Sequence, residues 1–249
     1  MSMVGPGIKL RGWSAWAPGL AAPADWLTWA RDGVDARREA APLALREIPP
    51  LLRRRADRMG RAALHALTRP ELPYAGQTVV MCSRLGEIGR SFCLQKELAS
   101  EGAVSPQQFS MSVHNAIGGL FMMAKKARAP LTTLAAGDEG ALAGLQEAAI
   151  QLADGAKAVW LLFCEEPLPE EYRPFVTSQK NATDHYAFVL ELATGDEFRL
   201  TTEERAAPNP DRAASPLDLL AFLLRPSDDA IQLTRRGGWT LRRTGRNGV

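Results

Sequence analysis

The sequence predicts an α/β fold, with a mostly parallel sheet covered by helices on both faces. Short apolar runs, such as residues 78–82 (TVVMC) and 158–164 (AVWLLFC), are typical of buried strands, and stretches with apolar residues at helical spacing separate them. Strands that alternate with helices favour parallel pairing, because a parallel connection has to cross the face of the sheet. A chain of 249 residues is also long enough to bury one sizeable core.

Composition and charge exclude several classes of protein. Hydrophobic residues make up 46% of the chain and charged residues 23%, which is ordinary for a globular protein. The formal net charge of +2 provides no overall field for nucleic acid. No apolar run approaches the ~20 residues of a membrane span, and the N-terminus lacks the pattern of a signal peptide. We expect a cytoplasmic protein with no membrane span and no nucleic-acid partner.

The cysteines and histidines give no sign of a metal site. Cys82, Cys93 and Cys164 show neither paired nor metal-ligand spacing, and two of them fall in apolar runs, where a buried free thiol is the commonest outcome. No histidine lies near a second histidine or a carboxylate at ligand spacing. The sequence also has no G-x-S-x-G elbow, no P-loop and no dinucleotide fingerprint. We expect no metal and no cofactor.

The first third of the chain predicts one strand and two helices. Residues 8–17 (IKLRGWSAWA) are apolar and aromatic enough for the strand. Asp25 favours the N-cap of a short helix. Residues 51–67 predict a single amphipathic helix, because their apolar residues repeat at helical spacing. Four arginines lie largely off that stripe, on a face that is either solvated surface or a docking patch for an acidic partner: Arg53, Arg54, Arg58 and Arg61.

Residues 112–126 predict the most apolar helix of the chain. Gly118 and Gly119 lie in its middle, where each glycine costs roughly 1 kcal/mol relative to alanine. Such glycines are usually kept where another backbone packs very close. A helix that is apolar on nearly all sides lies in the centre of a domain or at a subunit interface.

The other elements follow from the same patterns. Gly86 and Gly89 open a helix that Gly102 closes. The remaining expected elements are a strand at 131–135, a helix at 139–153, strands at 158–164 and 186–192, a helix with Ser215 as N-cap and Pro216 at its first position, and a last strand at 239–243.

The turn at residues 136–140 (AGDEG) lies where an α/β enzyme would place a nucleophile, and it contains no Ser, Cys or Thr. An aspartate at a helix N-terminus is an excellent cap, so we expect the Asp138 carboxylate to accept hydrogen bonds from the first-turn amides. A capping carboxylate stays ionised and is a poor nucleophile. The adjacent Glu165 and Glu166 point to opposite sides of an extended segment, so they cannot act on one atom together.

Residues 109–158 resemble the N-terminal half of the β-ketoacyl synthases of the thiolase fold. In that family an Asn-containing helix leads through R-G-P-S to a strand, an elbow with the catalytic Cys, a helix and another strand. This chain has Asn115, then RAPL at 128–131, and DGAKA at 154–158. The resemblance covers roughly residues 8–166 and implies a thiolase-like half-fold. We expect one domain over 1–249, with residues 167–249 as its divergent C-terminal part.

Aligned with the family pattern without a gap, the catalytic Cys falls on Asp138. The family's two catalytic histidines belong to its second half, and His185 is the only histidine among the 111 residues that follow Asp138 here. Without both features the decarboxylative condensation cannot proceed, because covalent catalysis needs an activated nucleophile. The stretches SVHNAIGGLF and EEPLPEEYRPF look most like chain-length factors, the inactive partners of ketosynthases in type II polyketide systems, in the short form found in aryl polyene pathways.

The resemblance implies partners and site residues as well. A chain-length factor forms a heterodimer with a catalytic β-ketoacyl synthase, and an acyl carrier protein delivers the growing chain. The arginine face could dock that acidic carrier protein. The implied interface residues are Asn115, Gly118 and Gly119, and those implied to limit product length are Ile88, Phe92, Phe121, Met122 and Met123.

Two rival functions remain open. One is a stand-alone acyl-transferase or thioester hydrolase that uses Asp138, His114 or Cys164. The other is a purely structural subunit that stabilises a synthase without touching its product.

Overall fold

The computed structural model describes residues 4–33, 43–175, 185–202, 214–234 and 238–244. The strands are β1 (Val4–Trp16), β2 (Thr78–Cys82), β3 (Leu131–Leu134), β4 (Val159–Glu165), β5 (Tyr186–Thr194), β6 (Phe198–Thr202), β7 (Ala230–Gln232) and β8 (Trp239–Arg243). The helices are α1 (Pro23–Asp32), α2 (Pro50–Arg53), α3 (Arg58–Leu67), α4 (Ile88–Glu101), α5 (Pro106–Ser110), α6 (Ala116–Lys125), α7 (Gly140–Ala153) and α9 (Pro216–Leu224), with short 3-10 helices η1 (Gly137–Glu139) and η2 (Glu170–Phe175).

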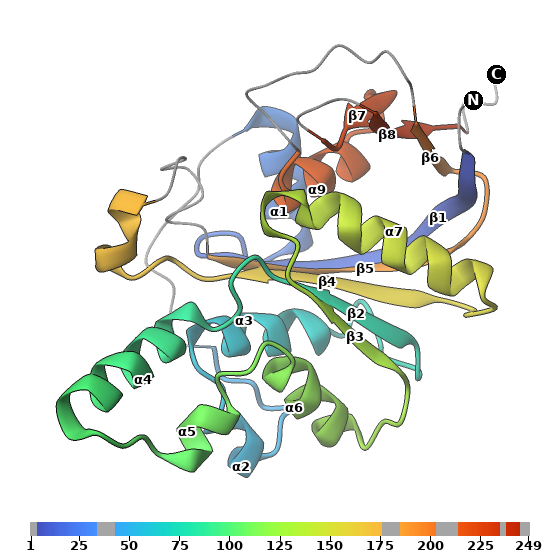
Figure 1. The fold of residues 1–249 in the computed structure, drawn as a ribbon. Helices are drawn as coiled ribbons and strands as arrows, with labels where there is room; N and C mark the ends of the chain where they lie inside the picture. The colour runs from blue at the N-terminus through green and yellow to red at the C-terminus, as the bar shows by residue number, and fades with distance from the viewer. Residues whose placement is uncertain (1–3, 34–42, 176–184, 203–213, 235–237, 245–249) are drawn as a thin grey trace.

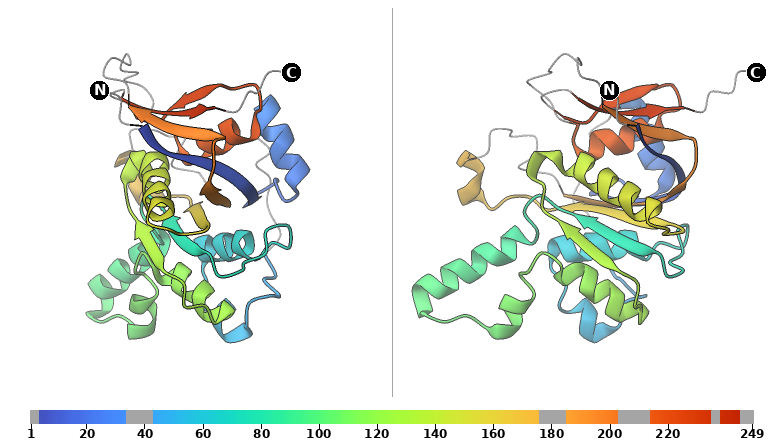
Figure 2. Two further views of the ribbon diagram at one scale, coloured as in Figure 1. Left: turned by 90° about the vertical axis from the view of Figure 1, so that its right-hand side faces the viewer. Right: turned by 45° about the vertical axis from the view of Figure 1, so that its right-hand side comes forward.

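The described strands form one sheet in the order β3-β2-β4-β5-β1-β6-β8-β7. Helices α7, α9 and α1 cover one face, and α3 and α6 cover the other (Figures 1 and 2). The α/β class and the cover on both faces are therefore confirmed.

The expectation of a mostly parallel sheet is wrong. Only the pairs β2–β3 and β2–β4 are parallel among the described strands, and the other neighbours run antiparallel. The cause is the place of β1, which lies between β5 and β6 and runs antiparallel to both. Strand β5 also runs antiparallel to β4, and β8 runs antiparallel to both β6 and β7.

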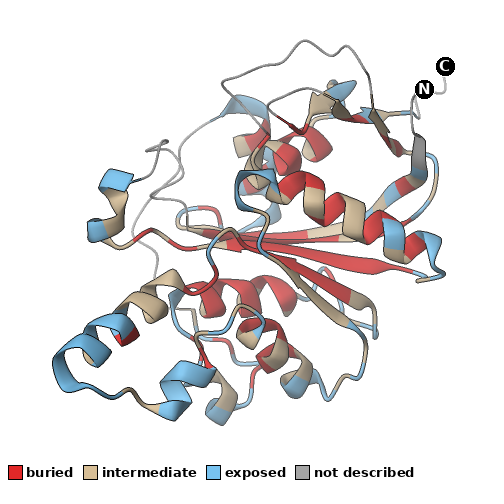
Figure 3. Ribbon diagram, in the orientation of Figure 1, coloured by how far each residue is buried: buried red, intermediate tan, exposed pale blue. Residues whose placement is uncertain are grey.

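The core has two halves, one on each face of the sheet (Figure 3). Side chains of β4 alternate between them: Leu161 and Phe163 pack towards α7 and α9, while Trp160 and Leu162 pack towards α3 and α6. A strand buried on both faces needs an apolar residue at nearly every position. This is why the apolar run at 158–164 identified β4 from the sequence.

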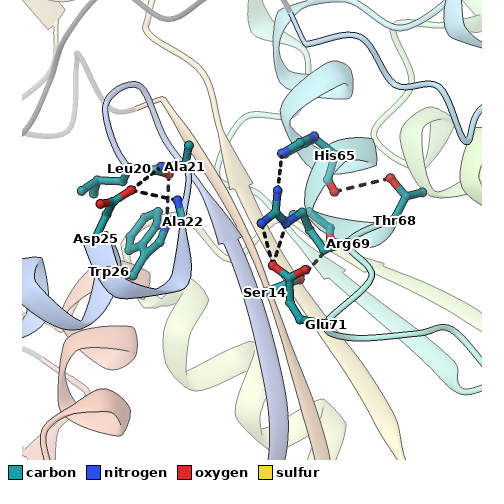
Figure 4. Close-up of polar contacts among 11 residues, drawn as sticks. Ser14, Leu20, Ala21, Ala22, Asp25, Trp26, His65, Thr68, Arg69 and Glu71 are labelled. Atoms are coloured by element: carbon teal, nitrogen blue, oxygen red, sulfur yellow. Dashed lines mark hydrogen bonds and ion pairs between the residues drawn. The ribbon is translucent and has the colours of Figure 1, made fainter.

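Three predicted helices begin or divide differently in the structure. The single helix expected at 51–67 is α2 and α3, with Asp57 at the N-cap of α3. The helix expected at 112–126 begins only at Ala116. Asp25 is not the N-cap of α1, because Pro23 takes the first helical position and makes Ala22 the cap. The Asp25 Oδ2 atom still accepts hydrogen bonds from the backbone N–H of Ala21 and Ala22, at 3.2 and 2.8 Å (Figure 4).

The last part of the chain fits the sequence more closely. Ser215 caps α9 through a hydrogen bond from the Asp218 backbone N–H to its Oγ, at 3.2 Å, and Pro216 is the first helical residue. Strand β8 has the predicted bounds. The short strands β6 and β7 were not predicted. None of the described helices is long and apolar enough to cross a membrane.

Candidate functional site

A pocket opens at the carboxyl ends of β2, β3 and β4, the edge where α/β sheets commonly bind ligands. It measures about 600 Å³ including its open mouth. The starts of α7 and α9 close two of its sides. Its polar lining includes Arg84, Asp138, Glu165, Tyr186 and Ser215.

Asp138 lies in this pocket but is not the N-cap residue of α7. It is the exposed middle residue of η1, and Glu139 occupies the N-cap of α7 without a side-chain hydrogen bond to the helix. The predicted cap position is therefore wrong, because one turn of 3-10 helix separates the elbow from α7. Gly137 begins this turn with a φ of 55°, which favours glycine. The predicted location of the elbow, between a strand and a helix, agrees with the structure.

The cysteines near the sheet are not activated. Cys82 lines the pocket, but burial, with a smaller contribution from Glu165, raises its pKa to about 12, so its thiol stays protonated at neutral pH. Cys164 is fully buried on the other face of the sheet, and burial raises its pKa well above the ordinary value. Cys93 is exposed on α4, away from the pocket lining.

None of the three histidines, all of which the structure describes, lines the pocket. The His114 Nε2 atom lies 3.2 Å from the Leu134 carbonyl oxygen, and burial lowers the pKa of this histidine. His185 packs edge-on against Trp16, with ring centroids 5.0 Å apart. His65 Nε2 lies 3.4 Å from Arg69 Nη1 (Figure 4). The structure thus does not unite Asp138, His114 and Cys164 in one site.

The five residues proposed to limit product length do not form one surface. Phe121 is fully buried, with its ring 5.0 Å from that of Tyr74, and the Met122 Sδ atom lies 3.9 Å from the Tyr74 hydroxyl. Met123 is 53% exposed on the outer side of α6.

The other two of these residues lie on α4. Ile88 begins the helix and is partly buried. Phe92 packs edge-on against Tyr172 of η2, with ring centroids 5.2 Å apart, and Lys96 lies over its ring.

The two glycines of α6 have different surroundings. A Cβ atom at Gly118 would lie 2.8 Å from both Leu131 Cδ atoms, so this glycine lets β3 pack close to α6 within the chain. A Cβ atom at Gly119 would meet nothing within 4 Å. Asn115 is exposed at the N-cap of α6. Asn115 and Gly119, unlike Gly118, therefore remain available to another molecule.

Two of the four arginines anchor the chain that precedes them. Arg53 donates a hydrogen bond from Nη1 to the Ala44 carbonyl oxygen at 3.1 Å, and Arg61 donates to the Leu43 carbonyl oxygen. Arg54 and Arg58 are exposed. The predicted basic face is therefore smaller than the sequence indicated, because Arg53 and Arg61 donate to backbone carbonyls of the chain itself.

Sequence reasoning missed several exposed apolar side chains around α4, α5 and α6. The most exposed are Leu98 at 53%, Phe109 at 60% and Val113 at 45%. Their exposure could not be recognised because α4 and α6 were expected to bury most of their apolar residues.

A profile of the family described as beta-ketoacyl synthase, N-terminal domain, matches residues 26–240. The chain therefore belongs to this family, which confirms the resemblance seen in the sequence. A search of the curated proteins found no match.

Three solved structures show the same fold. A chain of the ketosynthase ApeO in complex with its chain length factor ApeC, from Xenorhabdus doucetiae, superposes with a TM-score of 0.79 at 24% identity, over 95% of this chain and 99% of that one. The ishigamide ketosynthase/chain length factor superposes with a TM-score of 0.64 at 15% identity, over 82% of this chain and 69% of that one. The complex of the ketosynthase AntDE with the carrier protein AntF gives a TM-score of 0.58 at 15% identity, over 76% of this chain and 63% of that one. At these identities the likeness shows a thiolase-like fold.

Proposed function

We propose that this chain is a non-catalytic subunit that pairs with an active β-ketoacyl synthase and shapes its acyl chamber, as a chain length factor does. One observation carries the proposal. The elbow where the family has its catalytic Cys presents Asp138 to a pocket whose described lining has one thiol, which is buried and protonated, and no histidine. The pocket therefore lacks the thiolate and the histidines with which the family carries out covalent acyl transfer.

The neighbouring structures support the finer part of the proposal. Two of them are ketosynthases with a chain length factor, and a third contains an acyl-carrier protein. The 99% cover of the chain in the ApeO–ApeC structure means that a partner of this short length occurs in such a complex. We therefore assign the chain to a type II polyketide or related pathway of the aryl polyene kind, with a ketosynthase and an acyl carrier protein as partners.

The edge of the sheet favours an interface beside α6. Strand β3 is the last strand of the described sheet, so one of its edges has no partner strand within the described residues. Exposed sheet edges readily pair with other chains. Asn115, Gly119 and Met123 lie on the neighbouring helix, where Gly119 would allow a second helix to approach closely.

Side chains that control product length have to reach the partner's chamber. Met123 and Phe92 remain candidates, and exposed Phe109 joins them, whereas Phe121 and Met122 act only through their own core. Their effect is steric, because filling the chamber blocks further elongation. Arg54 and Arg58 supply the exposed charge for an acidic carrier protein, with a steering effect that weakens as salt rises.

The central experiment is co-expression of the chain with a ketosynthase encoded beside it. We expect the two to co-purify, the complex to condense acyl-carrier-protein substrates, and Asp138→Ala to leave the rate unchanged. The matched control is Cys→Ala at the nucleophile of the ketosynthase, which should abolish condensation. If the purified chain alone condenses or cleaves an acyl thioester, the proposal is wrong and the rival enzyme is favoured.

A second experiment separates a chamber-shaping subunit from a purely structural one. We expect longer products when Phe92, Phe109 or Met123 is replaced by Ala in the complex. Leu98→Ala removes another exposed apolar side chain and serves as the control. Unchanged product length for all three variants would favour the structural subunit.

A further inference from the structure

Helices α4 and α5 form an arm, residues 88–110, that projects from the body of the molecule (Figures 1 and 3). Within this fully described segment, Leu94 is the only buried residue. Leu98 and Phe109 are exposed on it. Because burial of apolar area contributes little here, polar contacts at the base of the arm must largely determine its orientation.

Arg90 makes several of these contacts at the base of the arm, while further along it Lys96 and Gln95 contact Glu171 and Tyr172 of η2. Its side chain is only 8% exposed. Its Nε atom lies 2.8 Å from Glu87 Oε2, and its Nη2 atom lies 3.3 Å from Asp57 Oδ2 and donates to the Arg55 carbonyl oxygen at 3.0 Å. Its Nη1 atom donates to Gln108 Oε1. One guanidinium therefore joins α4 to the start of α3, to the link before it, and to α5.

Two buried carboxyl groups flank this guanidinium. Glu87 is 3% exposed, and its Oε1 atom has no hydrogen-bond partner among the described residues. Glu166 is 8% exposed and accepts a hydrogen bond from the Gly89 backbone N–H at 2.8 Å. Burial raises the pKa of Glu87 to about 7; Arg90 opposes this shift, and Glu166 and Asp57 add to it.

We propose that Arg90 is a positioning residue of the arm: it holds α4 against the body through Glu87, Asp57 and the Arg55 carbonyl, and it joins α4 to α5 through Gln108. By fixing the arm, Arg90 fixes where Phe109 and Leu98 lie. This inference rests on the proposed function in one respect only. The proposed function places Phe92 and Phe109, and therefore the arm, on the surface that faces the ketosynthase. A planar guanidinium suits the task, because its donors reach several acceptors at fixed angles.

The first test uses hydrogen exchange of the isolated chain and needs no partner. In Arg90→Met we expect arm amides to exchange at least about tenfold faster, because buried acceptors and Glu87 lose their partner. Amides of α7 serve as the internal reference. Arg54→Met removes an exposed arginine and should change nothing, and Arg90→Lys should restore protection only in part. Unchanged arm exchange in Arg90→Met would overturn the proposal.

The second test uses pH. Glu87 holds a proton when the arm is closed that it releases when the arm opens, so opening should become easier as pH rises from about 4.5 to about 7, after correction for intrinsic exchange. Burial also raises the pKa of Glu166, so Glu87→Gln should reduce this dependence and Glu87→Gln combined with Glu166→Gln should abolish it. A pH dependence of unchanged size in Glu87→Gln would refute the role of Glu87 at the base of the arm.

The third test connects the arm to the partner. We expect Arg90→Met to weaken co-purification with the ketosynthase or to change product length, while Arg31→Met, which removes a 74% exposed arginine of α1, does neither. If arm exchange rises but the complex is unaffected, the positioning role stands and the arm is not part of the interface. If no complex forms even with the unaltered chain, the proposed function fails, while the exchange results remain valid.

Discussion

Gly144 lies in the middle of α7 and faces the sheet. A Cβ atom built there would lie 2.9 Å from Cys82 Sγ and 3.0 Å from both Leu161 Cδ1 and Phe163 Cζ. These three side chains are at most 3% exposed, so they or α7 must shift to admit a methyl group. Gly144→Ala therefore tests how tightly α7 packs on β2 and β4.

Two effects oppose each other in this variant. Alanine in a helix interior gains about 1 kcal/mol over glycine, and overpacking a filled core costs about 1–3 kcal/mol. We expect Gly144→Ala to be destabilised by up to about 2 kcal/mol. Gly119→Ala is the matched control: its Cβ atom meets nothing within 4 Å, so it should gain up to about 1 kcal/mol.

Urea denaturation of both variants, followed by circular dichroism, measures the difference in unfolding free energy. We expect the two variants to differ by about 1–3 kcal/mol, or by several degrees in Tm for a chain of this size. Equal stability of the two would refute the close packing of α7 on the sheet.

Three further predictions concern the core and its titrating groups. Phe121→Ala should lower the unfolding free energy by about 3–5 kcal/mol, while Leu98→Ala, at 53% exposure, should change it by less than about 0.5 kcal/mol; urea titration measures both, and similar losses would contradict the assignment of Phe121 to the core. A thiol reagent followed by mass spectrometry should label exposed Cys93 rapidly and buried Cys82 and Cys164 only on unfolding; rapid labelling of Cys82 would show an activated thiol in the pocket. Burial raises the pKa of Glu87 from its ordinary 4.5 to about 7, so between these pH values the folded state binds a proton that the unfolded state releases. The unfolding free energy should therefore fall by up to about 3 kcal/mol as pH rises through this window, and Glu87→Gln should remove this loss. Equal pH slopes of the two proteins in urea titrations would count against this prediction.

The sequence identified elements whose local pattern matches their burial. Strands β2 and β4 are apolar at nearly every position because helices cover both faces, and Ser215 with Pro216 form a local helix start that needs no distant contact. Strand direction was predicted wrongly, because strand patterns do not reveal that β1 inserts between β5 and β6. Strands β6 and β7 are short and were missed for a related reason: they are defined by pairing with β1 and β8 rather than by an apolar pattern of their own.

The candidate site shows the same division between local and distant information. The elbow at Asp138 could be placed because a glycine-rich turn between a strand and a helix is a local signal. That Cys82 lines the pocket while Cys164 faces the opposite side depends on the register of β2 and β4, since adjacent residues of a strand point to opposite faces.

Arg90 and Glu87 reveal a second limit of sequence reasoning. They lie three residues apart, an ordinary helical pair on paper worth a few tenths of a kcal/mol. In the structure their contacts extend to Asp57 and Gln108, and the pair is almost completely buried. Burial makes the loss of either partner costly, because the other is left as an uncompensated charge. Removing one charge at the base of the arm should therefore disturb the arm, which has few apolar contacts. The sheet and the helices α7 and α3 that cover its two faces should be little affected.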